Sequence, residues 1–541
     1  MTGRIARQPA ALLLAGIVAL ALVLRILWLR TDSTFQRTDE VMFLLNALRL
    51  SSLNAQDLFW TLAFPWGYPV LLFILGVLSA YQGLGVPIRE TTIVVPFAVL
   101  GALGPWLLYR LARRAFPRGV ALIAALAVAV LPSHIAQSRT VAAWILASDL
   151  MMLTVLLAWR YLEHGRRSDA LAFSAALAIY LPTDNLAPGT LLLLFVMTFF
   201  WRAGSVAARA RATLAALLRP AVLVLPALSL GLLVAVQAVF VLTGRPTYGF
   251  LGHYLAGKVD RGIHLEPVLT GLWDNLGPPL AGLVLFGCLL AVVRPSRSRR
   301  AWVFLAWVLA FAVPTILLID PVGTLVSGYL TPLLMSLLAL GAAGLGAGIE
   351  VLARRLGRGA AAATGAVAFV LVFGLALALV PSRVHGRAVL FPVRPIGLWG
   401  GEIYGNDGAK TAGYWIRRHT PPGTLVLSDL RLFVGTYYFH RPTGALDRLE
   451  SLGHRVGVVA VTTAAGARAT AAGGLDGFGL AATVTHGGWT VLRIYARAAG
   501  PPVTLAAEEF DPRFDREFGR ISALRYPRIW GDDLRDSPPR R

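Results

Sequence analysis

The sequence predicts a mainly α-helical protein: a polytopic transmembrane bundle of about 11 spans with juxtamembrane helices, followed by a small extracytoplasmic α/β domain. Three observations predict this class. Hydrophobic residues make up 56% of the 541 residues. Windows of about 20 apolar residues, the length of a transmembrane helix, recur along the first 380 positions. After residue 381 the hydropathy drops, and segments rich in β-branched residues alternate with turn residues.

The spans are predicted from apolar length. The first, at 9–29, has no small-residue cleavage site after it, so we expect a retained helix and not a cleaved signal peptide. The other expected spans lie at residues 91–109, 119–132, 141–162, 168–182, 186–201, 220–243, 271–293, 301–319, 325–349 and 361–380.

The formal net charge of +22 is nearly all arginine, since Lys258 and Lys410 are the only lysines. The arginines gather in short connections between apolar segments, at residues 110–118, 163–169, 201–220, 294–300 and 353–359. This pattern follows the positive-inside rule and argues against nucleic acid as a partner. It predicts a multi-pass protein of the plasma (inner) membrane with a cytoplasmic N-terminus and an extracytoplasmic C-terminal domain.

The segment 67–85 is apolar enough to span, yet a crossing there would invert the loop 110–118 and every later loop. The positive-inside rule therefore favours a juxtamembrane helix at the outer face. Asp39 and Glu40 then lie outside, in a long first external loop.

The predicted domains are residues 1–380 for the bundle, 381–500 for the α/β domain and 501–541 for a charged tail. In the α/β domain, residues 408–439 predict a helix, a Pro-Pro-Gly turn and a strand, and residues 455–463 and 489–497 predict two further strands. The Ala/Gly-rich middle, 464–482, carries weak signals. The single cysteine, Cys288, excludes an intrachain disulfide and a thiolate metal cluster.

Asp39 and Glu40 are adjacent carboxylates between two apolar segments. One interpretation is a solvated helix start, where Thr38 caps the helix and the acidic residues complement its dipole. The other is a general base at the membrane surface, because apolar surroundings raise the proton affinity of a carboxylate.

A second candidate site is LPSHIAQSR, which follows a predicted span and contains His134. Arg139 stands at the outer end of the next span, where the positive-inside rule disfavours it, so it calls for a partner. A phosphate fits, because guanidinium binds it in a bidentate manner; a salt bridge to Asp39 or snorkelling to the interface fits as well. Asp149 lies deeper, where a carboxylate indicates function or the bundle interior.

The third candidate site is the external loop 243–267, in which aromatic residues alternate with glycines ahead of basic residues. This pattern suits sugar stacking and phosphate pairing, or an interfacial aromatic belt. The loop contains Tyr248, Phe250, His253, Tyr254, Lys258 and Arg261. The chain has no metal-ligand spacing and no nucleotide-binding fingerprint.

The order of four motifs carries a resemblance to a known class. These motifs are Asp39-Glu40, PWGYP (65–69), LYRLARRAFPR (108–118) and LPSHIAQSR to Asp149 (131–149). Over residues 9 to 200 the chain resembles GT-C class membrane glycosyltransferases, nearest to the protein O-mannosyltransferases and the lipid A aminoarabinose transferases. The later spans resemble the class in general layout.

The resemblance implies a sugar donor on a polyprenyl phosphate in the membrane lipid and an acceptor reached from the extracytoplasmic side. Transfer is then one inverting displacement, with Asp39 at the position of the catalytic Asp and Glu40 as its neighbour. Arg139, Lys258 and Arg261 are the candidates for the donor phosphate. Expected substrate contacts are His134, Tyr68, Tyr248 and His253, and no metal or other cofactor is indicated.

Two positions depart from the family pattern: PWGYP lacks the His- or Lys-Pro-Pro of relatives, and Gly328 stands where a late span often carries arginine. Two alternatives stay open, a non-catalytic transporter or flippase of lipid-linked glycans and a degenerate family member in envelope assembly. A transporter places its ionisable residues near the bilayer midplane. The clearest ionisable cluster in this sequence is at the outer surface, which favours the enzyme.

Overall fold

The computed structural model describes twelve main stretches of the chain: residues 8–26, 67–86, 90–183, 189–201, 204–242, 265–293, 300–318, 326–379, 408–430, 438–462, 474–486 and 489–506. It also describes isolated positions between 41 and 50 and at 187, 435 and 468. The chain forms two compact units. The first comprises Met1–Trp28, Ala55–Phe73 and Val94–Gly401, and the second comprises Leu29–Asn54, Ile74–Ile93 and Glu402–Arg541.

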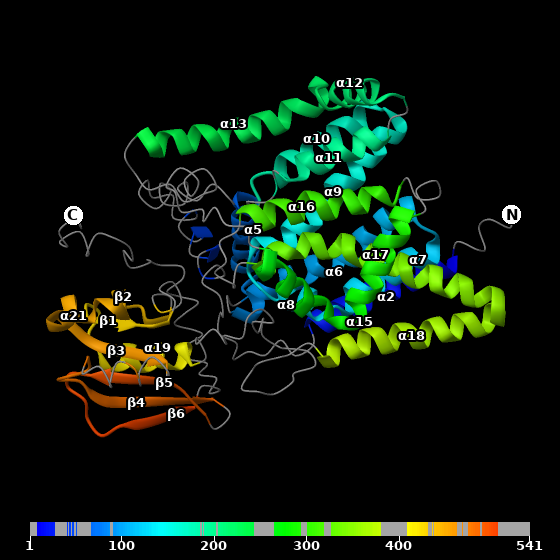
Figure 1. The fold of residues 1–541 in the computed structure, drawn as a ribbon. Helices are drawn as coiled ribbons and strands as arrows, with labels where there is room; N and C mark the ends of the chain where they lie inside the picture. The colour runs from blue at the N-terminus through cyan, green and yellow to red at the C-terminus, as the bar shows by residue number, and fades with distance from the viewer. Residues whose placement is uncertain are drawn as a thin grey trace. The chain divides into compact units, whose positions relative to one another are not determined.

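The first unit is a helical bundle (Figure 1), and a helix coincides with each predicted span. These helices are α2 (Gln8–Ile26), α6 (Glu90–Ala115), α7 (Arg118–Val130), α9 (Ala143–His164), α10 (Arg167–Tyr180), α11 (Gly189–Trp201), α13 (Pro220–Leu242), α15 (Leu265–Val293), α16 (Trp302–Leu318), α17 (Val326–Leu356) and α18 (Arg358–Leu379). Two further helices of this unit are α8 (Pro132–Ser138) and α12 (Val206–Leu217), and α5 (Tyr68–Leu84) is divided between the two units after Phe73.

Four of the described helical segments are long and apolar enough to cross a membrane by themselves: Thr92–Ala115, Ala143–His164, Leu276–Val293 and Leu330–Leu356. A fifth is obtained if α12 and the start of α13, which meet at a bend of 66°, form one span. Several other helices are apolar but shorter, and α5 is one of them. The span count of about 11 and the juxtamembrane position of residues 67–85 stay predictions.

Local sequence explains several helix ends. Gly165 adopts a left-handed φ of 66° after α9, and its N–H bonds to the carbonyl of Tyr161, the usual glycine end of a helix. The Ser205 hydroxyl accepts the N–H of Ala208 and caps α12. Gly277, at φ 65°, breaks α15 immediately before Pro278 and Pro279, whose rings cannot continue a regular helix.

Small residues bring α15 and α17 close together. A Cβ built on Gly287 would lie 1.9 Å from the carbonyl oxygen of Leu340, so only glycine allows this crossing. Membrane helices pack through such small residues, because lipid supplies no hydrophobic drive between them. The adjacent helix α16 also packs against α17, and its large side chains Trp307 and Phe311 are fully buried.

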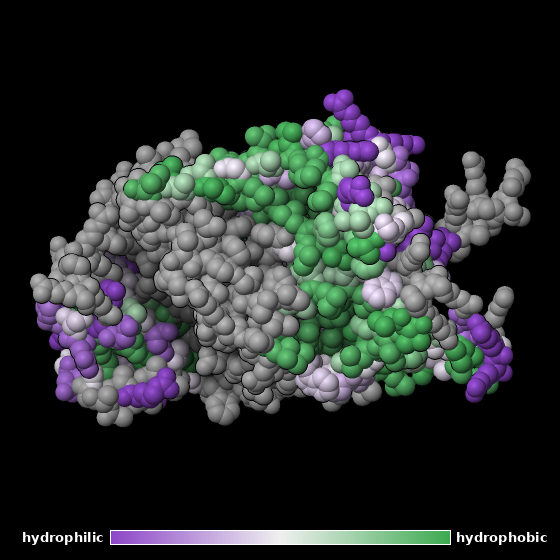
Figure 2. Space-filling view, turned by 45° about the horizontal axis from the view of Figure 1, so that its top comes forward, coloured by the Kyte–Doolittle hydropathy of each residue, from purple (hydrophilic) through white to green (hydrophobic). Residues whose placement is uncertain are grey.

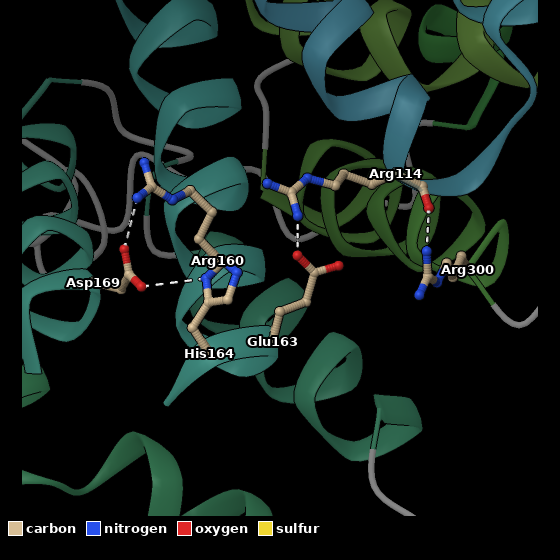
Figure 3. A network of polar contacts seen from close by, with 6 residues as sticks. All are labelled: Arg114, Arg160, Glu163, His164, Asp169 and Arg300. Carbon is tan, nitrogen blue, oxygen red and sulfur yellow. Dashed lines mark hydrogen bonds and ion pairs between the residues drawn. The ribbon is translucent and has the colours of Figure 1, made fainter. Parts of the chain in front are cut away.

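Three of the five basic connections meet at one end of the bundle (Figure 3). Arg114 at the end of α6 pairs with Glu163 at the end of α9. Asp169 of α10 pairs with Arg160 at 3.0 Å and with His164 at 3.4 Å.

The third basic connection is joined to the other two through Arg300, whose Nη1 donates to the carbonyl of Arg114 at 3.1 Å.

Figure 2 shows a broad hydrophobic surface over the helices, and hydrophilic side chains gather on the side where α12 and the α17–α18 junction lie in Figure 1. The positive-inside rule predicts that the basic connections share one side of the membrane, and the structure brings three of them together.

The second unit contains a six-stranded sheet in the order β2-β1-β3-β5-β4-β6. Strands β2, β1 and β3 run parallel, β5 is antiparallel to both β3 and β4, and β6 is parallel to β4. The strands are β1 (Leu425–Ser428), β2 (Thr443–Ala445), β3 (Val456–Thr462), β4 (Gly479–His486), β5 (Trp489–Ala496) and β6 (Val503–Ala506), and α19 (Ala409–His419) packs against β5.

The predicted helix and three predicted strands of this unit correspond to α19, β1, β3 and β5. Strand β4 begins inside the Ala/Gly-rich segment with weak signals, and β6 lies past residue 500, in the segment expected to be tail. Both strands form through pairing, since β4 bonds to β5 on one side and to β6 on the other. Pairing partners that are distant in sequence override weak local propensity.

Candidate functional site

A buried polar cluster lies inside the helical unit, where the C-terminal turns of α2 and α7 meet α6, α8 and α9. Its side chains are Arg25, His134, Ser138, Arg139 and Asp149, and none is more than 6% exposed. Ionisable groups among membrane helices are costly to bury, so a cluster of them indicates a functional or bundle-organising role.

Arg25 is the centre of the cluster and is fully buried. Its Nη1 donates to the carbonyls of Ala21 at 2.8 Å and Ala129 at 3.2 Å, and its Nη2 donates to the carbonyl of Val128 at 3.3 Å. The last carbonyls of a helix have no partner within it, and a cation is favoured at that end of the helix dipole. Arg25 therefore ties the end of α2 to the end of α7.

The Arg25 guanidinium determines the tautomer of the neutral His134 ring. Arg25 Nη2 lies 2.6 Å from His134 Nδ1, and Arg25 Nε donates to the Ser138 hydroxyl at 3.0 Å. Because arginine can only donate, Nδ1 must accept, and a neutral ring then carries its proton on Nε2. The Ser138 hydroxyl donates to the His134 carbonyl at 2.6 Å, which holds the side chains of α8 in register.

Asp149 is the second buried charge. Within the part of the chain that the structure describes, neither of its carboxylate oxygens has a hydrogen-bond partner, and neither does His134 Nε2. Both groups converge on Gly104, since a Cβ built there would lie 3.1 Å from His134 Nε2 and 3.3 Å from Asp149 Oδ1. Arg25 attracts the carboxylate electrostatically. His134 Nε2 and Asp149 Oδ1 thus approach the same point on α6 without a hydrogen bond between them, an arrangement that can hold a water.

Arg139 lies at the edge of the cluster and holds the end of α2. Its Nε donates to the carbonyl of Arg25 at 3.0 Å, and its Nη2 donates to the carbonyl of Leu24 at 2.5 Å. The partner that this arginine was expected to need is therefore at least partly the C-terminal turn of α2. Binding of a donor phosphate by Arg139 stays a prediction.

Gly101 makes room for this arrangement on α6. A Cβ built there would lie 2.1 Å from the Ser138 hydroxyl oxygen and 2.5 Å from Ser138 Cβ. We expect Gly101→Ala to lower the free energy of unfolding by about 1–3 kcal/mol, the usual cost of overpacking, although alanine is the better helix former. Equilibrium unfolding of the purified protein in detergent measures the change.

The matched control for Gly101 is Gly16→Ala in α2, where the added Cβ meets nothing within 4 Å. We expect this control to leave stability unchanged or slightly raised. Combining Gly101→Ala with Ser138→Gly removes both clashing atoms and should recover part of the loss. A Gly101→Ala protein as stable as the wild type would contradict the close approach of α6 and α8.

Of the other predicted site residues, Tyr68 is the one that the structure describes. Tyr68 begins α5 and is half-buried, and the N–H of the preceding Gly67 bonds to the carbonyl of Pro182 at 2.6 Å. Six predicted residues lie outside the described part of the chain: Asp39, Glu40, Tyr248, His253, Lys258 and Arg261. Among the described residues, no group of three His, Cys, Asp or Glu side chains could hold a metal ion.

Sequence reasoning missed Arg25, although a signal for it was present. It interrupts the apolar run of the first predicted span, and an arginine within a span indicates a buried partner. The partners themselves were not predictable, because Ser138 and His134 are more than 100 residues away along the chain.

We compared the sequence with known protein families and with curated proteins. Residues 69–229 match a protein family described as dolichyl-phosphate-mannose-protein mannosyltransferase, and the match includes His134, Arg139 and Asp149. No curated protein sequence gives a significant match.

Two solved glycosyltransferases share the fold. ArnT from Cupriavidus metallidurans in the apo state aligns with a TM-score of 0.55 and 15% identity, over 90% of this chain and 98% of its own. The same protein bound to undecaprenyl phosphate gives 0.55 and 16%, over 90% and 99%. The Archaeoglobus fulgidus oligosaccharyltransferase gives 0.54 and 13%, over 84% and 69%. The resemblance to GT-C class glycosyltransferases is therefore confirmed at the level of the fold.

Proposed function

We propose that this chain is a multi-pass membrane glycosyltransferase that transfers a sugar from a polyprenyl-phosphate donor to an extracytoplasmic acceptor. The observation that carries the proposal is a fold shared over 90% of the chain with ArnT, one of whose structures holds undecaprenyl phosphate. The mannosyltransferase family match over residues 69–229 supports the same class of donor.

The proposed reaction is one inverting displacement with Asp39 as the general base and Glu40 beside it. A phosphate-linked sugar already carries a good leaving group, so one base that takes the acceptor proton suffices. The departing lipid phosphate needs positive charge, for which Arg139, Lys258 and Arg261 are the candidates. The acceptor is a protein, a lipid or a cell-wall glycan, and no metal is required in this scheme.

The buried cluster takes a positioning role in the proposal. Arg25 and Arg139 together bind carbonyls at the C-terminal turns of α2 and α7. The chain continues from α2 to Asp39, 14 residues after Arg25. A general base must be held within hydrogen-bond reach of the proton it abstracts, and a fixed end of α2 supplies a rigid origin for the segment that carries it.

The proposed orientation puts the N-terminus in the cytoplasm and the C-terminal domain outside the plasma (inner) membrane. The meeting of three basic connections at one end of the bundle supports it. With this orientation, sugar transfer takes place on the outer side, where a lipid-linked donor and an external acceptor can meet.

One observation favours a second candidate, a transporter of lipid-linked glycans. The structure places Arg25 and Asp149 inside the helix bundle, and buried ionisable groups of this kind also occur in transporters. The two functions differ in their product, because only the enzyme breaks the sugar–phosphate bond.

The test is transfer by the purified full chain in nanodiscs. The assay supplies radiolabelled polyprenyl-phosphate mannose and a membrane extract as acceptor, with a mock preparation from cells that lack the chain as control. We expect label to move into one acceptor fraction, which identifies the acceptor class, and excess unlabelled polyprenyl phosphate to inhibit. The proposal fails if no polyprenyl-phosphate hexose or pentose is consumed while reconstituted vesicles move the intact donor across the bilayer.

A further inference from the structure

We propose that an apolar crevice at the basic end of the bundle binds an acyl chain of an anionic phospholipid. The crevice has a volume of about 510 Å³ and lies between α7, α15, α17 and the start of α16. Its wall includes Phe116, Ile123, Leu290, Ala301, Ala343 and Ala347. The volume is typical of ligand sites, which measure roughly 300–1,000 Å³.

The crevice is separate from the buried polar cluster. It is lined by Gly119, Val120 and Ile123 of α7, whereas Arg25 binds Val128 and Ala129 near the other end of that helix. Ile123 and Val128 lie about 7.5 Å apart along the helix at the ordinary rise. No side chain of the buried polar cluster lines the crevice, so the two are distinct sites.

The crevice lies between two close helix contacts that α17 makes, one with α15 and one with α7. The small residues in its wall leave it unfilled. On one side, Gly287 of α15 packs onto the Leu340 carbonyl of α17. On the other, a Cβ on Gly346 would lie 2.5 Å from Val120 Cγ2, so α7 and α17 also approach closely. Protein interiors tolerate few voids, and an apolar crevice that opens among membrane helices gains dispersion contacts when a lipid chain enters it.

Two arginines lie beside residues that line the crevice. Arg113 Nη1 donates to the carbonyl of Phe116 at 3.2 Å, and Phe116 lines the crevice. Arg300 donates to the carbonyl of Arg114 and immediately precedes Ala301, which also lines it. Both side chains are exposed, so their remaining N–H groups can reach a ligand.

The charge beside the crevice selects the headgroup. The one acidic side chain in the crevice wall is Glu350, and Arg354 neutralises it through an ion pair of 2.5 Å. Arg113 and Arg300 then leave a net positive charge beside an apolar slot. Guanidinium groups bind phosphate strongly, and basic residues at the membrane surface favour anionic lipids. An anionic phospholipid matches both halves of the site, its chain in the slot and its phosphate at the arginines.

The test measures lipid retention by native mass spectrometry. The purified full chain is reconstituted with equal amounts of phosphatidylglycerol and phosphatidylethanolamine of the same acyl chains, then extracted and weighed. We expect wild type to retain phosphatidylglycerol preferentially. Ala347→Phe fills the slot, and we expect it to lower retention of the lipid about tenfold, whereas Ala366→Phe on the exposed face of α18 should change nothing.

Arg300→Gln tests the headgroup without touching the slot. We expect the preference for phosphatidylglycerol to fall about tenfold, the effect of losing one hydrogen bond to a charged group. Arg211→Gln makes the same charge change on an exposed position of α12 and serves as its control. Because Arg300 is exposed, this arm is valid even if phenylalanine at position 347 prevents folding.

Three results would overturn the proposal. The first is equal retention by wild type, Ala347→Phe and Ala366→Phe. The second is a wild-type protein with no preference between the two headgroups. The third is a co-purifying polyprenyl phosphate that Ala347→Phe displaces, which would assign the crevice to another lipid.

Discussion

Replacing Asp39 with asparagine is expected to lower the rate of sugar transfer by about 100- to 10,000-fold, the usual contribution of a positioned general base. Asparagine keeps the size and most of the polarity of the side chain but cannot take a proton from the acceptor. The loss should appear in kcat, with little change in the KM for the lipid-linked donor, because the base acts in the transition state. Single-turnover transfer in nanodiscs measures the two parameters separately.

Asp57→Asn is the matched control for Asp39→Asn, since it removes a carboxylate from the same predicted external loop. We expect it to retain wild-type activity, and Glu40→Gln to lose less than Asp39→Asn. The wild-type pH–rate profile should fall on its acid side as the carboxylate is protonated, and this limb should vanish in Asp39→Asn. Equal activity of Asp39→Asn and wild type, in protein that unfolds at the same temperature, would remove Asp39 as the base.

Apolar length made the helices of the bundle predictable. A bilayer sets the length of a crossing segment, so runs near 20 residues indicate helices without any knowledge of their packing. The predicted span at 141–162 and α9 (Ala143–His164) differ by two residues at either end. The same reasoning could not foresee α12 or the 66° bend that separates it from α13, because the composition of residues 201–220 indicates only a basic connection.

The candidate site was predictable in part. His134 and Arg139 were identified because polar and basic residues at an outer membrane boundary are noticeable, and Asp149 because a carboxylate within a predicted span is rare. The partners of Arg139 were not predictable, because backbone carbonyls carry no sequence signal. Gly101 and Gly104 could not be distinguished among the 54 glycines of the chain, since their role depends on where α8 and α9 lie.

The prediction and the structure differ most in which ionisable groups form a cluster. The sequence placed the main cluster at the outer surface, around Asp39 and Glu40, which lie outside the described residues. The structure adds a second cluster that is buried around Arg25. We propose a division of labour between them, in which Asp39 and Glu40 act on the substrate and the buried cluster holds the ends of α2 and α7.

Arg25→Leu tests that division and is expected to lower the free energy of unfolding by about 3–5 kcal/mol, the cost of breaking a buried charge network. The substitution removes every donor that Arg25 supplies to the α2 and α7 carbonyls, to His134 and to Ser138. Asp149 then becomes a buried carboxylate without its cation. Equilibrium unfolding in detergent measures the loss, and Arg355→Leu at an exposed position of α17 is the control.

The double substitution Arg25→Leu with Asp149→Asn separates charge from packing. If Arg25 offsets the charge of Asp149, neutralising the carboxylate in the Arg25→Leu background should restore about 1–3 kcal/mol, while Asp149→Asn alone destabilises the protein. Additive losses would mean that the two residues are not coupled and that Arg25 acts only on the helix ends.

Arg25→Lys keeps the positive charge but loses the planar guanidinium, so its stability should lie between those of wild type and Arg25→Leu. Because the end of α2 leads to Asp39, Arg25→Lys should also lower kcat more than it raises KM, a change that a purely structural role would not produce.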